Sequence, residues 1–297
     1  MENLVTEQRN PASIDIDKRS IEEVLRIINA EDKKVAYAVE EEIPKISKAV
    51  DLIVDSIKKG GKLFFIGAGT GGRLGVMEAA EMATTFGVSL DLVQGIIAGG
   101  IEALYGPVEG AEDNRAAGII DLLNRGFTSK DVLVGISASG RTPYTVAALE
   151  FAKKMGAKTI AITCNPNSEI AKIADITIEV IVGPEVITGS TRMKAGTAQK
   201  MVLNMLTTAT MIKLGKVYEN FMVDLKVVNE KLKERAKRII MAVTGVSHDE
   251  ADKAINAAQG NVKAAIIMIK SKVSYKEALS LLERSGGALR KALEGIS

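Results

Sequence analysis

Residues 62–72 read KLFFIGAGTGG, a short apolar run that leads into a glycine-rich turn. Because the run is apolar throughout and glycines bound it, it predicts a β-strand buried on both faces. A helical pattern follows from Arg73 to about Thr85. Further strands are predicted at 90–98, 131–136, 158–163 and 176–182, and further helices at 113–123, 143–156 and 191–214. Apolar strands that alternate with helices predict an α/β fold with a doubly wound parallel sheet.

Helical patterns flank this α/β region on both sides. Before it, Ser20-Ile21-Glu22-Glu23 matches a helix capping box, and a second amphipathic run ends at Gly60-Gly61. After Gly215 the strand pattern ends, and short helices separated by glycines follow. We therefore predict an N-terminal helical segment at 1–61, a sheet domain at 62–239 and a small C-terminal helical subdomain at 240–297.

The composition excludes several classes of protein. The 39 Lys and Arg residues nearly balance the 37 Asp and Glu residues, which argues against a nucleic-acid or anionic-membrane partner. The single cysteine, Cys164, excludes an internal disulfide and a multi-cysteine zinc site, and we expect it to be a small buried residue. The single histidine, His248, argues against histidine metal sites and a His-dependent triad. With a polar start and no apolar stretch of roughly 18 residues, we expect a cytoplasmic protein.

Three loops that follow predicted strands are rich in Gly, Ser and Thr: GAGTGG at 67–72, SASGRT at 137–142 and TGSTRMKAGT at 188–197. In open α/β sheets, ligands bind outside the carboxyl ends of the strands. Glycines allow the backbone to approach a ligand closely, and hydroxyls and helix N-terminal amides donate hydrogen bonds to anions. Such residues also collect in loops without function, but three loops in one sheet favour a site for an anionic ligand, above all a phosphate.

Two other interpretations, a dinucleotide site in the first loop and a catalytic role for nearby carboxylates, have less support from the residue pattern than the anion site. The first loop matches the dinucleotide pattern G-x-G-x-x-G, but Asp91 begins its predicted strand instead of ending it, which disfavours a nicotinamide site. By spacing alone, Glu78 and Glu81 indicate a solvated helix face. The acidic cluster at 109–113 likewise indicates favourable charge at a helix start, so spacing does not single out a catalytic carboxylate.

Longer motifs make the chain recognisable. They are LVTEQRNPAS at 4–13, FIGAGTGGRLGVMEAAE at 65–81, VEGAEDNR at 108–115, ISASGRTPY at 136–144 and TGSTRMKAGTAQKMVLNML at 188–206. In these stretches the sequence resembles bacterial N-acetylmuramic acid 6-phosphate etherases, members of the SIS (sugar isomerase) superfamily. The resemblance implies a flavodoxin-like SIS fold and cleavage of a lactyl ether to N-acetylglucosamine 6-phosphate and D-lactate. It also implies a role in peptidoglycan recycling, no metal or redox cofactor, and a homodimer with sites near the interface.

The resemblance also assigns roles to individual residues. Glu81 matches the family's proton donor to the departing lactate, and this role favours a partly desolvated carboxyl. Glu112 matches the second active-site carboxylate, which we assign as the base, with Asp113 as an alternative. The residues expected to bind the substrate and its 6-phosphate are Gly69, Thr70, Ser137, Ser139, Gly140, Thr142, Ser190 and Lys194.

Two departures from the family pattern bear on the site. Gly71 stands where the family's first loop usually has a serine, so one phosphate-facing hydroxyl is absent. Met82-Ala83-Thr84 replaces the common Cys-Pro-Pro, and without the prolines we expect the helix to continue beyond Glu81 and to shift its carboxylate.

Two alternative functions remain open at this stage. One is a non-catalytic sugar-phosphate-binding regulator, a type of protein that also occurs in the superfamily. The other is an aldose-ketose isomerase, which shares proton abstraction at carbon 2 but has no leaving group to protonate. The presence of both Glu81 and Glu112 favours the etherase.

Overall fold

The computed structural model of the chain describes residues 4–225, 227 and 229–295. The chain divides into two compact units. The first contains the residues up to Ala80 together with Leu90–Thr207, and the second contains Glu81–Ser89 together with the residues from Thr208 onward.

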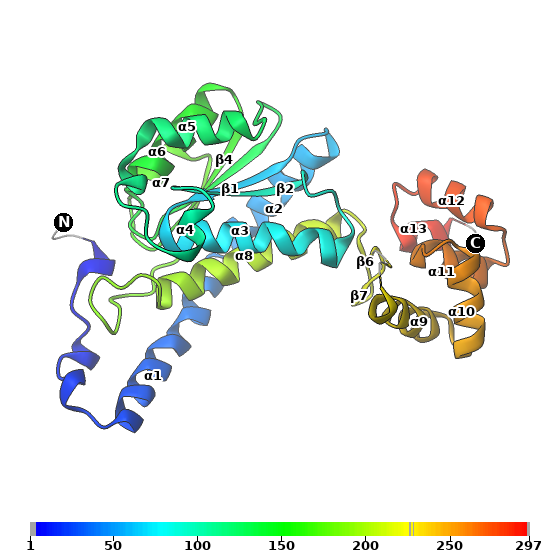
Figure 1. Ribbon diagram of the computed structural model, residues 1–297, viewed down its shortest axis with the longest axis horizontal. Coiled ribbons are helices and arrows are strands. Elements are labelled where there is room, and N and C mark those ends of the chain that lie inside the picture. The colour runs from blue at the N-terminus through cyan, green and yellow to red at the C-terminus, as the bar shows by residue number, and fades with distance from the viewer. Residues whose placement is uncertain (1–3, 226, 228, 296–297) are drawn as a thin grey trace. The chain divides into compact units, whose positions relative to one another are not determined.

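The first unit is built on a five-stranded parallel sheet in the order β2-β1-β3-β4-β5 (Figure 1). The strands are β1 Leu63–Gly67, β2 Val93–Ile97, β3 Val132–Ile136, β4 Lys158–Thr163 and β5 Ile176–Glu179. This order confirms the doubly wound sheet. It also places the topological switch point between β1 and β3, where the connections leave toward opposite faces and a crevice opens at the carboxyl ends.

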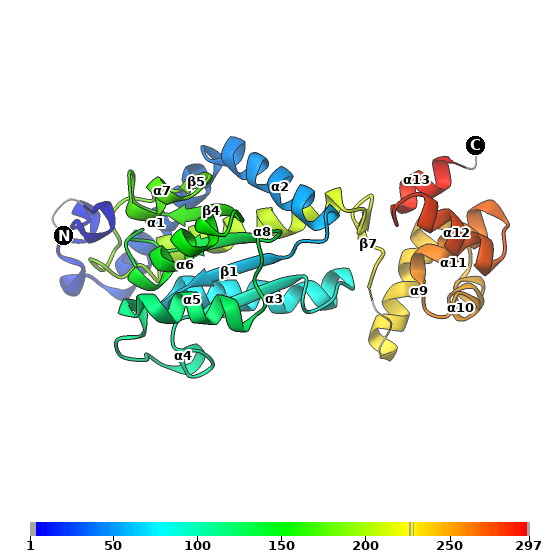
Figure 2. The same cartoon turned by 90° about the horizontal axis from the view of Figure 1, so that it is seen from above.

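Helices cover both faces of the sheet. In Figure 1, α5 and α6 lie above it and α3 and α8 lie below it, while α2 contacts β5 (Figure 2). The helices of this unit are α1 Ile21–Glu40, α2 Ile43–Lys58, α3 Gly69–Phe86, α4 Glu102–Tyr105, α5 Arg115–Asn124, α6 Pro143–Lys154, α7 Glu169–Ile173 and α8 Lys194–Lys213. The last residues of α3 and α8 belong to the second unit.

Alternating side chains of β1 explain the two-sided burial. Phe64 and Ile66 belong to a core that includes Tyr144 and Leu149 of α6. Phe65 lies on the other face, where Gly75 of α3 leaves room for it: a Cβ at Gly75 would come within 2.9 Å of the Cβ of Phe65. The strand is therefore apolar throughout because both of its faces are covered.

The helix ends follow the predicted capping residues. At the start of α1, the Ser20 hydroxyl accepts a hydrogen bond from the Glu23 amide, and the Glu23 carboxylate accepts one from the Ser20 amide. α2 ends at Lys58, just before Gly60-Gly61. α3 continues past Glu81 to Phe86, which confirms that the helix extends without the prolines, whereas the expected shift of the Glu81 carboxylate stays a prediction.

The structure differs from the sequence-based prediction in three places. α3 begins at Gly69, inside the glycine-rich loop, instead of at Arg73. The short helix α7 follows the turn at 165–168 and was not predicted. After Gly215, strands β6 Val217–Tyr218 and β7 Phe221–Met222 form a small antiparallel hairpin, so the strand pattern does not end there. Each of these elements is too short, or too rich in glycine, to give a clear periodicity.

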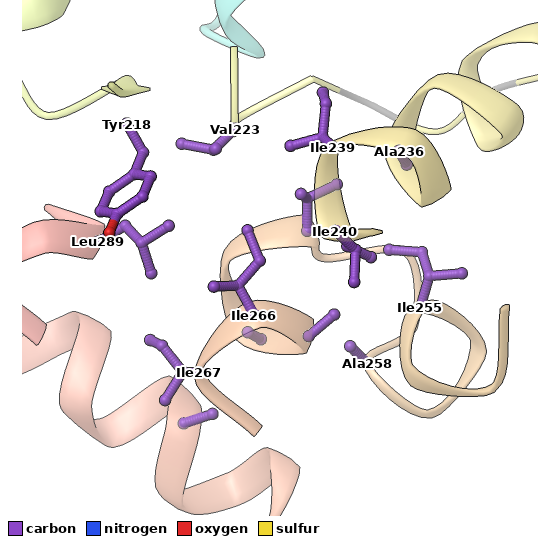
Figure 3. Close-up of a cluster of buried hydrophobic side chains, with 14 of the residues drawn as sticks. Tyr218, Val223, Ala236, Ile239, Ile240, Ile255, Ala258, Ile266, Ile267 and Leu289 are labelled. Carbon is purple, nitrogen blue, oxygen red and sulfur yellow. The ribbon is translucent and has the colours of Figure 1, made fainter. Parts of the chain in front are cut away.

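The second unit has a helical core of its own. It contains α9 Glu230–Thr244, α10 His248–Ala257, α11 Val262–Ser271, α12 Tyr275–Arg284 and α13 Leu289–Glu294. Figure 3 shows Ile239 and Ile240 of α9 close to Ile255 and Ile266 of this core. From the sequence we predicted that the helical subdomain begins at 240. The compact unit also includes all of α9, because the buried face of α9 packs in the same core.

A buried lysine connects separate segments of this unit. The Lys263 ammonium donates hydrogen bonds to the carbonyls of Gly215, at 2.9 Å, and Gly287, at 2.6 Å, and pairs with Asp224. Burial lowers the pKa of Lys263, and the Asp224 carboxylate opposes that effect. These contacts join the hairpin region to the start of α11 and to the turn before α13.

Within the described ranges, no helix is both long and apolar enough to cross a membrane. His248 begins α10, with Ser247 as its capping residue.

Candidate functional site

A cavity of about 280 Å³ lies at the carboxyl ends of β1 and β3, the predicted location for a ligand. The first glycine-rich loop contributes Gly69, Thr70 and Gly71, and the second loop contributes Ser137, Ser139 and Thr142. The third loop contributes Gly189 and Thr191. The structure therefore brings the three loops singled out in the sequence to one place.

The first loop presents the start of a helix to the cavity. Gly69, Thr70 and Gly71 are the first residues of α3, and the first amides of a helix lack intrahelical partners and favour anions. Gly71 has no room for the serine side chain of the family pattern. Its Cβ would lie 2.8 Å from Cγ2 of Ile136, so the Ile136 side chain occupies the space that a serine requires.

The second loop presents a connected group of hydroxyls. Ser137 Oγ lies 2.8 Å from Thr142 Oγ1 and 3.3 Å from Ser139 Oγ, and it accepts a hydrogen bond from the Gly140 amide at 3.0 Å. Ser137 is buried, whereas Ser139 and Thr142 are half-buried. Such a group fits a phosphate, because each hydroxyl can rotate to donate to an anionic oxygen.

Gly140 supports this loop without lining the cavity. Its φ is +68°, in the left-handed region, and a Cβ there would lie 2.3 Å from Cβ of Ser168. Both facts require glycine, so Gly140 determines the shape of the loop, and its predicted role in binding the substrate stays a prediction. Asn165 fixes the other side of the loop, because its side-chain amide donates to the Ala138 carbonyl at 2.8 Å.

Two carboxylates lie at the cavity. Among the described lining residues, Glu7 and Glu112 are the ionisable ones, and both are exposed. Glu112 lies in a short 3₁₀ turn, Ala111–Asp113, and the neighbouring Asp113 does not line the cavity. The predicted site thus gains one unexpected carboxylate, Glu7, and one buried amide side chain, Gln199.

Lys194 and Ser190 do not line the cavity. The Lys194 ammonium is buried and lies 2.6 Å from Oε2 of Glu31 on α1, and its backbone amide donates to the buried Glu185 carboxylate at 3.0 Å. Burial favours a raised pKa at Glu31, but hydrogen bonds from Lys194, Lys34 and Asn10 outweigh it and lower the pKa to about 2. Lys194 therefore fixes the start of α8, which lies within the third loop.

Glu81 lies twelve residues after Gly69 on α3, about three helical turns further along. It belongs to the second unit, is exposed instead of desolvated in the single chain, and does not line the cavity. Its neighbour Glu78 is not the solvated residue that spacing suggested. Glu78 is buried, where its carboxylate pairs with Lys200 and accepts a hydrogen bond from Thr207 Oγ1 at 2.6 Å.

Cys164 is buried as predicted, and burial raises the pKa of its thiol to about 12, with the Glu185 charge adding to the effect. In the part of the chain that the structure describes, no three His, Cys, Asp or Glu side chains gather closely enough to hold a metal ion.

Models of the SIS domain match residues 29–164 and 121–209, which include the whole sheet and all three loops. Over 296 residues the chain is 56% identical to N-acetylmuramic acid 6-phosphate etherase of Clostridioides difficile (strain 630), covering all of this chain and 97% of that protein. The chain belongs to the N-acetylmuramic acid 6-phosphate etherase family. A protein of the same name from Actinobacillus succinogenes is 56% identical over 290 residues, which are 98% of this chain and 95% of that one.

This membership confirms the resemblance drawn from the motifs. Among solved structures, phosphoheptose isomerase from Neisseria gonorrhoeae matches with a TM-score of 0.50 at 19% identity. The match covers 64% of this chain and 98% of that one, and it agrees with the SIS fold of this etherase family member.

Proposed function

We propose that the protein cleaves the D-lactyl ether of N-acetylmuramic acid 6-phosphate and forms N-acetylglucosamine 6-phosphate and D-lactate. The full-length identity of 56% to a curated etherase carries this proposal. The reaction would serve the recycling of peptidoglycan amino sugars in the cytoplasm.

In this proposal the 6-phosphate binds between the first two loops. The amides at the start of α3 and the hydroxyls of Ser137, Ser139 and Thr142 supply the donors. No lysine or arginine is among the described residues that line the cavity, so neutral donors and the helix N-terminus balance the phosphate charge.

The chemistry begins at carbon 2 of the open-chain sugar. The hydrogen there is acidic because it is alpha to the aldehyde, and a positioned base can remove it. We assign this base to Glu112, since its side chain lines the same cavity as the phosphate donors, whereas Asp113 does not. Lactate then leaves from carbon 3, and water adds to the unsaturated aldehyde at the same carbon.

The departing lactate needs a proton, because an alkoxide is a poor leaving group. The family resemblance assigns this proton to Glu81. Since Glu81 does not line the cavity of its own chain, we propose that it acts in the cavity of a second copy in a homodimer. Burial against that copy would desolvate the carboxyl and favour the protonated form that a general acid needs.

A lactate-release assay tests the function. We expect the purified protein to release D-lactate from N-acetylmuramic acid 6-phosphate, and Glu81→Gln and Glu112→Gln each to lower the rate by about 10²-fold or more. Binding of sugar phosphates without lactate release would instead support a regulator. Formation of a ketose, with solvent deuterium at carbon 2, would support an isomerase.

Mixing the two variants tests the shared site. If Glu81 serves the partner's cavity, a mixed dimer of Glu81→Gln and Glu112→Gln has one intact site of its two, and a random mixture recovers about a quarter of wild-type activity. If both carboxylates serve the same chain, every site carries one substitution and the mixture stays inactive. A monomer by analytical ultracentrifugation at assay concentration would also contradict the shared site.

A further inference from the structure

The segment of residues 4–13, here called the N-terminal segment, is fixed to the loops around the cavity. Thr6 Oγ1 accepts a hydrogen bond from the Asn165 side-chain amide at 2.9 Å, and the Thr6 amide donates to Asn165 Oδ1 at 3.3 Å. Further along, Asn10 Nδ2 donates to the Pro184 carbonyl at 3.0 Å and Ser13 Oγ to the Val186 carbonyl at 2.7 Å. The side chains of Thr6, Asn10 and Ser13 are thus buried, and their hydrogen bonds fix the position of the segment.

Between these anchors, the segment brings Glu7 to the cavity. Thr6 is 1% exposed and Asn10 is 5% exposed, whereas Glu7 between them is exposed and lines the cavity. The Glu7 carboxylate lies beside Gly189 of the third loop, where a Cβ would come within 3.1 Å of Glu7 Oε2. Glu7 is therefore held at the site by its neighbours and by its own amide, which donates to the Leu4 carbonyl at 3.0 Å, while no hydrogen bond or ion pair described for its carboxylate explains where that group lies.

The charge of the Glu7 carboxylate limits which groups of a bound sugar phosphate it can contact. It cannot stabilise the phosphate, because the two groups carry like charge. The phosphate donors come from the first and second loops, whereas Glu7 approaches beside the third loop. A carboxylate is an acceptor, and the remaining donors of a sugar phosphate are its hydroxyl and amide groups.

We propose that Glu7 is a substrate-binding residue that accepts hydrogen bonds from the hydroxyl or amide groups of the sugar and so selects a sugar phosphate over phosphate alone. The proposal rests on the proposed sugar-phosphate function and deepens it. The N-terminal segment is then part of the binding site, and Asn165 fixes both this segment and the second loop through Thr6 and the Ala138 carbonyl.

The test compares two probes by titration calorimetry, N-acetylglucosamine 6-phosphate and inorganic phosphate. For Glu7→Gln we expect the Kd of the sugar phosphate to rise roughly 10-fold, because a neutral amide oxygen and an NH₂ group replace the charged acceptor. The Kd of inorganic phosphate should stay unchanged or fall, because a nearby negative charge is removed. Glu40→Gln, the same change at an exposed position of α1, is the control and should leave both Kd values unchanged.

Two results would overturn the proposal. One is an unchanged Kd of the sugar phosphate in Glu7→Gln. The other is an equal weakening of both probes, which would mean that the substitution damages the phosphate loops. Both readouts are independent of lactate release, so an inactive protein would contradict the proposed function and still leave the role of Glu7 measurable.

A second variant tests the anchor. Thr6→Val keeps the shape of the side chain but removes the acceptor of the Asn165 amide, so Glu7 is placed less well. We expect Thr6→Val to weaken sugar-phosphate binding, and the double variant with Glu7→Gln to bind no more weakly than Glu7→Gln alone. Fully additive losses would show that the anchor and Glu7 act independently and would overturn this part of the proposal.

Discussion

The ammonium of Lys194 lies 2.6 Å from the carboxylate of Glu31, and both side chains are buried although 163 residues separate them in the sequence. This pair joins α1 to the start of α8, because Lys194 is both the first residue of α8 and a residue of the third loop. Lys194 was expected near the substrate because the family resemblance implies that role. The structure gives it a partner that already balances its charge.

Removing this lysine should destabilise the protein. Lys194→Met leaves the buried Glu31 carboxylate with Lys34 as its remaining lysine partner, and we expect a loss of about 3 kcal/mol in the free energy of unfolding. Lys18→Met, at an exposed pair with Asp15, should change it by less than about 1 kcal/mol. Urea unfolding followed by circular dichroism measures both. A double variant that adds Glu31→Gln should be no less stable than Lys194→Met, and a further full loss would contradict this account.

The same pair predicts a dependence of stability on pH. Because hydrogen bonds outweigh burial and lower the pKa of Glu31 to about 2, the unfolded chain binds more protons than the folded one between about pH 5 and pH 2. The contribution of Glu31 is therefore present above about pH 5 and is lost as the pH falls through this window. From pH 4 to pH 3 the wild type should lose about 1 kcal/mol more than Glu31→Gln. Equal losses in urea titrations at the two pH values would disprove the assignment.

The fold could be predicted from the sequence because its strands are short apolar runs bounded by glycines and other loop residues. Phe64 and Phe65 are adjacent and both buried, on opposite faces of β1, as expected for a short strand that is covered on both sides. The loops after β1 and β3 follow from this, because parallel strands bring their carboxyl ends to one edge. Ser137 and Thr142 could thus be placed at the site without a structure.

The remainder of the site depends on contacts that local sequence does not encode. Asn165 and Thr6 are 159 residues apart, so neither spacing nor periodicity links Glu7 to the cavity. One signal was available: the stretch at 4–13 is part of the family resemblance, yet no role had been assigned to its polar residues. Glu78 was misjudged for a similar reason, since its partners Lys200 and Thr207 lie on α8.

Gly140 should tolerate no side chain. Gly140→Ala places a Cβ 2.3 Å from Ser168 in addition to the strain of a positive φ, whereas Gly126→Ala, at φ +69°, meets nothing within 4 Å. We expect Gly126→Ala to cost about 1 kcal/mol from backbone strain alone, and Gly140→Ala to cost more and to weaken phosphate binding. Calorimetric titration with phosphate and urea unfolding measure the two effects. Equal behaviour of the two variants would show that the contact with Ser168 is not decisive.

The choice between Glu112 and Asp113 as the base has a direct test. Both lie in one 3₁₀ turn, but only Glu112 lines the cavity with Ser137 and Thr142. Glu112→Gln is nearly isosteric and keeps a polar group, yet it cannot accept a proton from carbon 2, so we expect lactate release to fall by about 10²-fold or more. Asp113→Asn should retain activity within about threefold, since its carboxylate lies outside the lining. Exchange of the carbon 2 hydrogen in deuterated buffer, followed by NMR, should fail in the first variant and persist in the second. The reverse pattern would make Asp113 the base and would require the turn at 111–113 to rotate when substrate binds.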